Sequence, residues 1–78
     1  MTIRRVPFDE IPQSLRSAGV TAREYEVLQL LIERLGNREI ADRLHLSQRT
    51  VEKHVSSLIS KTGLPNRVAL SKFAATVH

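Results

Sequence analysis

The chain contains no cysteine and no tryptophan, and only 1 tyrosine and 2 phenylalanines among its 78 residues. Without cysteine, neither a disulfide framework nor a zinc–cysteine site can stabilise a domain of this size, so an apolar core has to do so. The shortage of aromatic rings also removes the stacking platforms with which proteins read RNA and single-stranded DNA. The length allows one small domain and excludes a multidomain enzyme.

Long apolar runs are missing as well. The longest, from Val27 to Ile32, is interrupted by Gln29 and is far shorter than the ~20 residues that cross a bilayer. The N-terminus has arginines but no apolar segment followed by a cleavage site, so it does not resemble a secretory signal. We therefore expect a cytoplasmic protein that does not bind membranes.

Motifs that carry catalytic or metal chemistry are also absent. The sequence has no nucleophile elbow, no phosphate-binding loop and no nucleophile paired with a base at a suitable spacing. Its histidines, His45, His54 and His78, do not share a helical face with a carboxylate at ligand spacing. We predict no enzymatic activity, no metal and no cofactor.

What the chain does have is an excess of positive charge. Its 12 Lys and Arg residues against 8 Asp and Glu residues give a formal net charge of +4, and the sequence pI is near 10.4. Such a balance favours a polyanionic partner, either nucleic acid or an acidic membrane surface. Because stacking platforms are scarce, duplex DNA is the better candidate.

The N-terminal segment has an ambiguous pattern. Its apolar residues at helical spacing are Phe8, Ile11 and Leu15. Asp9 can cap a short helix with Pro12 in its first turn, and Gly19 can end that helix. Residues 1–19 are therefore either a tail or linker that packs loosely, or they include a short extra helix ahead of a domain at residues 20–78.

A long helix is predicted next. Thr21 and Glu24 form a capping box, which indicates a helix that begins at Ala22. The apolar face of this helix consists of Val27, Leu28, Leu31, Ile32 and Leu35. We expect Gly36 to end it with a positive φ.

Two further helices follow with a tight turn between them. Asn37 can cap a short helix that runs to about Leu44, Leu46 fills the corner, and Ser47 caps a longer helix that Gly63 ends. The apolar face of the longer helix consists of Val51, Val55, Leu58 and Ile59. A short helix, a tight corner and a longer amphipathic helix make a helix-turn-helix unit, which places its second helix in the major groove of DNA.

The outer face of that second helix is rich in side chains that recognise bases. By helical geometry, its outermost residues are Glu52, Lys53 and Ser56. Glutamate can accept a hydrogen bond from cytosine, lysine can donate to guanine, and serine can contact either class of base. After Gly63, Asn66 can cap a fourth helix with a broad apolar stripe.

Four motifs occur in the order and spacing of a known family: "TAREYEVL", "NREIADRLHLS", "RTVEKHV", and "KTG" followed by "NR". Residues 20–74 thereby resemble the LuxR/FixJ/NarL-type DNA-binding domain. The resemblance implies an all-α, tetrahelical helix-turn-helix bundle that is a bacterial transcriptional regulator, or the C-terminal effector domain of one. It also implies a dimer on an inverted-repeat site, with duplex DNA and RNA polymerase as partners.

The resemblance assigns roles to individual residues. Positions that face bases fall on Glu52, Lys53 and Ser56. Positions that contact phosphates fall on or near Arg38, Ser47, Arg49, Thr50, His54, Ser57 and Lys61. The dimer contact falls on the stripe of the last helix, which consists of Val68, Ala69, Leu70, Phe73, Ala74 and Val77. Arg34 and Gly36 depart from the family pattern, so we expect a different first turn, and Thr62 replaces a usual leucine and weakens an apolar seal.

Several residues have two possible roles, and the domain has two possible functions. Glu24, Glu39 and Arg67 are either partners in ion pairs that tie helices together or solvated surface charges. His54 either donates to phosphate or packs partly buried. The alternative function is a helical protein–protein interaction module without DNA binding. Salt separates the two functions, because the affinity for DNA falls with a log-log slope of about −0.9 per phosphate contacted.

Overall fold

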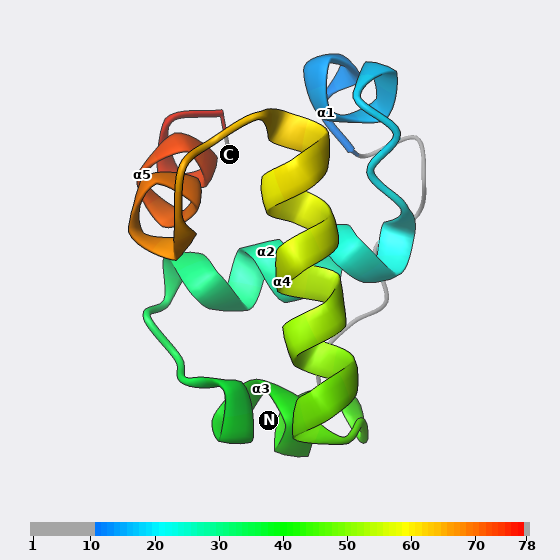
Figure 1. Ribbon diagram of the computed structural model, residues 1–78, viewed down its shortest axis with the longest axis vertical. Coiled ribbons are helices and arrows are strands. Elements are labelled where there is room, and N and C mark those ends of the chain that lie inside the picture. Colours follow the sequence, from blue (N-terminus) through cyan, green and yellow to red (C-terminus); the bar gives the residue numbers. More distant parts are fainter. Residues whose placement is uncertain (1–10, 78) are drawn as a thin grey trace.

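The computed structural model describes residues 11–77, and this range contains helices and no strand. The helices are α1 (Gln13–Ser17), α2 (Ala22–Ile32), α3 (Asn37–Leu44), α4 (Gln48–Thr62) and α5 (Arg67–Val77). Helix α4 runs along the long axis and crosses α2, with α3 at its N-terminal end and α1 and α5 on opposite sides of its C-terminal end (Figure 1). The predicted all-α helix-turn-helix bundle, with a short extra N-terminal helix, is therefore confirmed.

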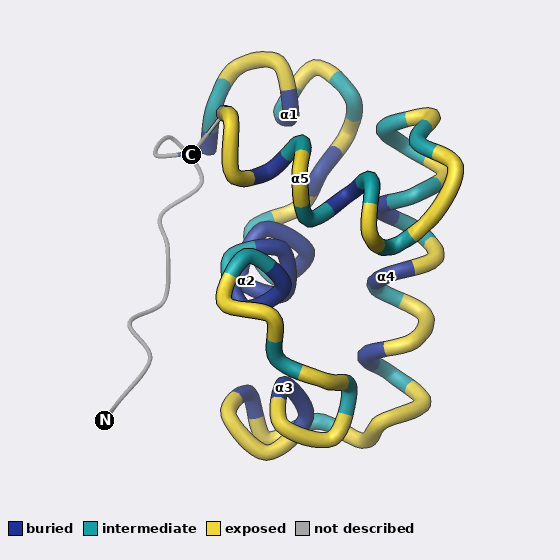
Figure 2. Tube along the Cα trace, turned by 90° about the vertical axis from the view of Figure 1, so that its left-hand side faces the viewer, coloured by how far each residue is buried: buried dark blue, intermediate teal, exposed yellow. Residues whose placement is uncertain are grey.

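Helix α2 is the centre of the core. It packs against both α4 and α5, while α3 packs against α4. Its residues are buried on nearly every side (Figure 2), which is the pattern of a helix enclosed by its neighbours. The buried set on α2 consists of the predicted Val27, Leu28 and Leu31, and in addition Glu24, Tyr25, Glu26 and Leu30. Two carboxylates thus lie within the core, and each of them needs a partner.

The predicted starts of α2, α4 and α5 are confirmed by their capping bonds. Thr21 Oγ1 accepts from the Glu24 N–H at 3.2 Å, and Glu24 Oε1 accepts from the Thr21 N–H at 2.9 Å. Ser47 Oγ accepts from the Thr50 N–H at 3.1 Å. At the start of α5, Asn66 Oδ1 accepts from the backbone N–H of Ala69 at 2.9 Å. Because these bonds satisfy N–H groups that have no partner inside the helix, local sequence alone could locate the starts.

The predicted end of α2 is wrong. The helix ends at Ile32, and Arg34 rather than Gly36 adopts the left-handed conformation, with φ of 64°. The Arg34 N–H bonds to the Leu31 carbonyl at 2.9 Å and the Leu35 N–H to the Leu30 carbonyl at 3.3 Å, which are the two bonds of a Schellman motif. Gly36 is extended instead, with φ of −79°, and precedes α3 as its N-cap residue in place of Asn37.

The left-handed Arg34 leads to a stability prediction. An L-residue with a side chain in this region costs ~1 kcal/mol relative to glycine. We expect Arg34→Gly to raise the melting temperature by about 4–8 °C, the shift that ~1 kcal/mol produces in a domain of this size. The matched control is Glu33→Gly, because Glu33 has φ of −77° and gains nothing from glycine. An Arg34→Gly variant that melts at or below the wild-type temperature would contradict this reading of the turn.

The N-terminal segment contributes to the core. Ile11 and Leu15 are each only 1% exposed. Pro12 precedes α1 as its N-cap residue instead of lying in its first turn, and Gly19 has φ of +92° in the connection to α2. The predicted roles of Phe8 and Asp9 lie outside the described residues. The core therefore extends beyond the boundary predicted at residue 20.

Candidate DNA-binding surface

Helices α3 and α4 and the turn between them form the candidate surface. The turn is tight because His45 takes φ of 57°, while the Leu46 N–H bonds back to the Ala41 carbonyl at 2.9 Å. Leu46 is partly buried against the core, as predicted for the corner. Val51, Val55 and Leu58 of α4 are buried. This buried face fixes which side of α4 faces the solvent.

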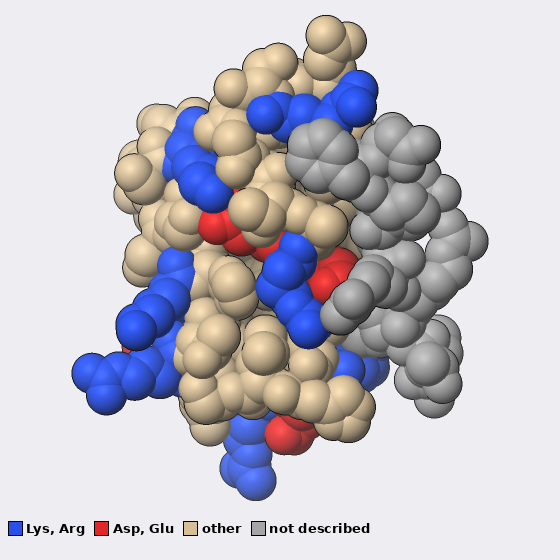
Figure 3. Space-filling view, turned by 90° about the vertical axis from the view of Figure 1, so that its right-hand side faces the viewer, with Lys and Arg blue, Asp and Glu red and all other residues tan. Residues whose placement is uncertain are grey.

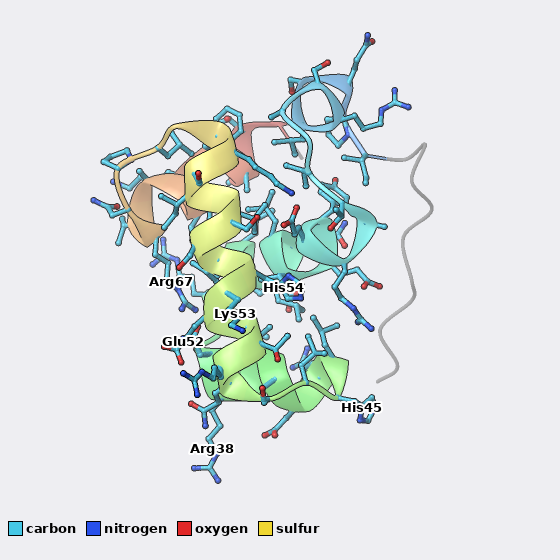
Figure 4. The ribbon with its side chains drawn as sticks, turned by 45° about the vertical axis from the view of Figure 1, so that its right-hand side comes forward. Arg38, His45, Glu52, Lys53, His54 and Arg67 are labelled. Atoms are coloured by element: carbon cyan, nitrogen blue, oxygen red, sulfur yellow. The ribbon has the colours of Figure 1, made fainter. Side chains whose placement is uncertain are left out.

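The side chains predicted to face bases lie on the opposite side of α4. Glu52, Lys53 and Ser56 are all exposed. Figure 4 shows Glu52 and Lys53 projecting from the outer side of α4, and Arg38 projecting from α3 beside the start of that helix. His54 lies at the side of α4, near α2, and is partly buried. The outer side of α4 and the neighbouring Arg38 therefore carry a carboxylate, an ammonium, a hydroxyl and a guanidinium.

The start of α4 offers donors suited to phosphate. The hydroxyls of Ser47 and Thr50 are hydrogen-bonded to each other at 2.9 Å. The side chain of Arg49 is exposed beside them. The first turn of a helix also presents N–H groups and the positive end of the helix dipole, which attract anions. This end of α4 is therefore suited to attract a phosphate, and Arg38 and Arg49 add exposed positive charge.

Two of the predicted phosphate contacts are already bound within the domain. Ser57 Oγ donates to Glu24 Oε2 at 2.7 Å, and Lys61 Nζ donates to Glu24 Oε1 at 2.7 Å. Lys61 Nζ also donates to the Gly19 carbonyl at 2.8 Å. We call Glu24, Ser57 and Lys61 the Glu24 cluster. It joins the start of α2 to the second half of α4.

The carboxyl of Glu24 is ionised in this environment. Burial alone raises its pKa, but hydrogen bonds from Lys61, Ser57 and the Thr21 N–H, together with the charge of Lys61, bring the pKa below the ordinary value. Of the two readings for Glu24, the structural ion pair is the one observed.

Arg67 also ties separate parts of the chain together, but it bonds to an amide and a carbonyl. It donates to the Asn37 side-chain carbonyl, and to the Leu35 carbonyl at 2.8 Å. The start of α5 is thereby bound to the connection between α2 and α3. Glu39 instead caps its own helix, because its Oε1 accepts from the Gly36 N–H at 3.1 Å. Thr62, the departure noted in the sequence, donates its hydroxyl to the Leu58 carbonyl at 2.7 Å.

The predicted dimer stripe of α5 needs a correction. Leu70 is 0% and Ala74 is 1% exposed, so both side chains are enclosed by their own domain and cannot reach a second copy. Val68 is 63% exposed, and Ala69 and Phe73 are partly buried. The predicted contribution of Val77 concerns a side chain that the structure does not describe. The stripe is broad because it serves two purposes: one side of α5 faces α2 and the other faces the solvent.

Among residues 11–77 there is no group of three or more His, Cys, Asp or Glu side chains arranged to hold a metal ion. No helix in the described range is both long enough and apolar enough to span a membrane.

Comparison with known proteins identifies the family. The sequence profile described as "Bacterial regulatory proteins, luxR family" matches residues 18–74. The chain belongs to this luxR family. The match covers α2 to α4, with their turns, and most of α5. The predicted resemblance and the function class, a DNA-binding regulatory domain that is not an enzyme, are confirmed.

Named relatives in the luxR family are regulators. The chain is 42% identical over 57 residues to the "DNA-binding transcriptional activator DevR/DosR" of Mycobacterium tuberculosis, a match to 73% of this chain and 26% of that protein. It is 46% identical over 66 residues to the "Probable transcriptional regulator ycf29" of Porphyra purpurea, a match to 85% and 31%. It is 50% identical over 54 residues to the "Response regulator Rre1" of a Synechocystis strain, a match to 69% and 23%.

These relatives are longer than the region they share with this chain. The chain spans 26%, 31% and 23% of their lengths. No solved structure matches the chain significantly. The likeness to luxR-family proteins therefore concerns the helix-turn-helix domain and not the remainder of those regulators.

The Glu24 cluster is the part of this surface that sequence reasoning missed. For Glu24 the sequence allows either an ion pair with no named partner or a solvated charge, and for Ser57 and Lys61 it predicts contacts with phosphate. One signal could have connected them, because Ser57 and Lys61 are four residues apart and must lie on one side of a helix. The sequence does not reveal that this side faces α2, since that depends on how the two helices cross.

Proposed function

We propose that this domain binds duplex DNA sequence-specifically with α4 in the major groove. The single observation that supports this most strongly is the division of α4 into two faces. Val51, Val55 and Leu58 are buried, and on the opposite side Glu52 and Lys53 are exposed. Lysine can donate to guanine, and glutamate can accept from cytosine.

The phosphate contacts in this proposal come from the first half of α4 and from α3. Arg38 and Arg49 supply exposed charge, and His54 adds a donor at the side of α4. Ser47 and Thr50 place hydroxyls at the N-terminal end of the helix. Ser57 and Lys61 belonged to the predicted set but are left out of this proposal, because Glu24 already binds both of them.

The regulatory role of the whole protein is part of the same proposal. One relative is named a DNA-binding transcriptional activator and another a response regulator. By analogy, we propose a transcriptional regulator that acts in the cytoplasm as a dimer on inverted repeats, with this domain as its effector. A contact with RNA polymerase, the further partner implied by the family, would use a surface left free by DNA and by the second copy.

Substitutions on α4 test base reading. We expect Lys53→Ala to change the preferred half-site, because one good base contact discriminates by ~1–3 kcal/mol. The matched control is Arg49→Ala, which removes the same charge at a predicted phosphate contact and should weaken all duplexes alike. The measurement is selection of binding sites from random duplexes, followed by titration of the selected site and of unrelated DNA. Equal losses on all sequences for Lys53→Ala would remove it from the base-reading set.

A further inference from the structure

The Glu24 cluster sits at the edge of the proposed DNA-binding surface. A carboxylate of α2 whose side chain is 7% exposed holds two donors of α4, Ser57 Oγ and Lys61 Nζ, each at 2.7 Å. The side chain of Lys61 is 30% exposed, so its ammonium lies at the boundary between the core and the solvent. On the face drawn in Figure 3, acidic groups near the centre lie between basic side chains, while other Lys and Arg side chains project at the edges.

Both donors belong to the same row of α4 as the base-reading Lys53. Residues 53, 57 and 61 are spaced by four, and each step turns about 40° around the helix. The row therefore begins on the exposed face at Lys53 and turns gradually towards α2, where Glu24 meets its last two members. Without the carboxylate, a lysine side chain at position 61 is long enough to swing towards the solvent and the DNA backbone.

A lysine released from Glu24 at position 61 would add non-specific affinity for DNA. Contacts with phosphates add affinity for every duplex and carry no sequence information. They also release counterions, so each one makes the affinity fall more steeply with salt. A lysine that is paired with a buried carboxylate makes no such contribution.

We propose that Glu24 is a specificity-determining positioning residue for DNA binding: it withholds Ser57 and Lys61 from the DNA backbone. The low pKa of its carboxyl means that this restraint is present at neutral pH. The effect is a lower affinity for unrelated DNA at a given affinity for the cognate site. This inference rests on the proposed function of sequence-specific DNA binding.

The first test is Glu24→Gln, which keeps the size of the side chain and removes its charge. Binding to the selected site and to unrelated duplex is measured over a series of salt concentrations, after a thermal melt has established folding. We expect the affinity for unrelated duplex to rise roughly two- to fivefold, which corresponds to the free energy of one partly exposed ion pair. The log-log salt slope should become steeper by about 0.9. The ratio of specific to non-specific affinity should fall.

Two further variants separate this effect from a change in net charge. Glu33→Gln removes the same charge at an exposed position at the end of α2, and its salt slope should match that of the wild type. Glu24→Gln combined with Lys61→Gln should restore the wild-type slope, because the released ammonium is gone. A Glu24→Gln variant that is folded but has unchanged slope and unchanged affinity ratio would overturn the inference.

Lys61→Gln in the wild-type background tests directly whether Lys61 contacts a phosphate. This variant keeps the inference testable even if Glu24→Gln fails to fold. Glutamine still donates to Glu24 but carries no charge. We expect an unchanged salt slope, because the ammonium is already withheld from DNA. A slope that is shallower by about 0.9 would mean that Lys61 contacts a phosphate, which would overturn the inference. A wild-type protein that does not distinguish the selected site from unrelated DNA would instead refute the proposed function.

Discussion

Replacing Leu58 with Asp is expected to unfold the domain at room temperature. Leu58 lies in the second half of α4 and is 0% exposed, and α4 packs there against α2 and α5. The substitution removes apolar packing worth ~2–5 kcal/mol and buries a charge with no partner, which adds several kcal/mol more. A domain of this size has a total stability of only ~5–15 kcal/mol.

The matched control for Leu58→Asp is Ser56→Asp. It introduces the same residue two positions earlier on the same helix, where the side chain is exposed, so the helix content should be retained. Circular dichroism during a thermal melt measures both variants. If Ser56→Asp unfolded and Leu58→Asp melted like the wild type, α4 would be rotated and the assignment of Glu52, Lys53 and Ser56 to the DNA would fail with it.

Most of the fold could be predicted because local chemistry determines it. Thr21, Ser47 and Asn66 each provide a side-chain acceptor for an N–H group of the helix that follows, and these bonds involve residues only three positions apart. Gly63, with φ of 72°, ends α4 as expected. Where one residue and its near neighbours decide the outcome, sequence was sufficient.

The parts that could not be predicted depend on how helices pack. The apolar stripe of α5 was recognised, but only its position against α2 separates buried Leu70 from exposed Val68. The roles of Ser57 and Lys61 likewise depend on a carboxylate more than thirty residues earlier in the chain. The prediction for the end of α2 was wrong for a local reason. Hydrogen bonds from the Leu35 and Arg34 N–H groups to the Leu30 and Leu31 carbonyls outweighed the preference for glycine at the left-handed position.

Val68 is the residue of α5 on which the proposed dimer contact depends most. Because the contact is small, it should be detectable mainly as cooperative binding to DNA. Val68 is the large apolar residue that the described part of the chain leaves exposed. A patch centred on this one side chain is far smaller than the ~1,200–2,000 Å² of a stable interface, so free domains should be largely monomeric. Two domains bound to adjacent half-sites present this patch to each other at high effective concentration.

We therefore expect Val68→Glu to abolish cooperative binding to an inverted repeat whose half-sites are about one helical turn apart. The affinity for the full repeat should fall roughly a hundredfold, because each copy then places a carboxylate opposite its symmetry mate. The affinity for a single half-site should change far less. The control is Gln13→Glu, which adds the same charge at an exposed position of α1, on the other side of α4 from α5 (Figure 1). Titration of both variants against full and half sites measures the difference, and a Val68→Glu protein that stays as cooperative as the wild type would exclude this face of α5 from the dimer.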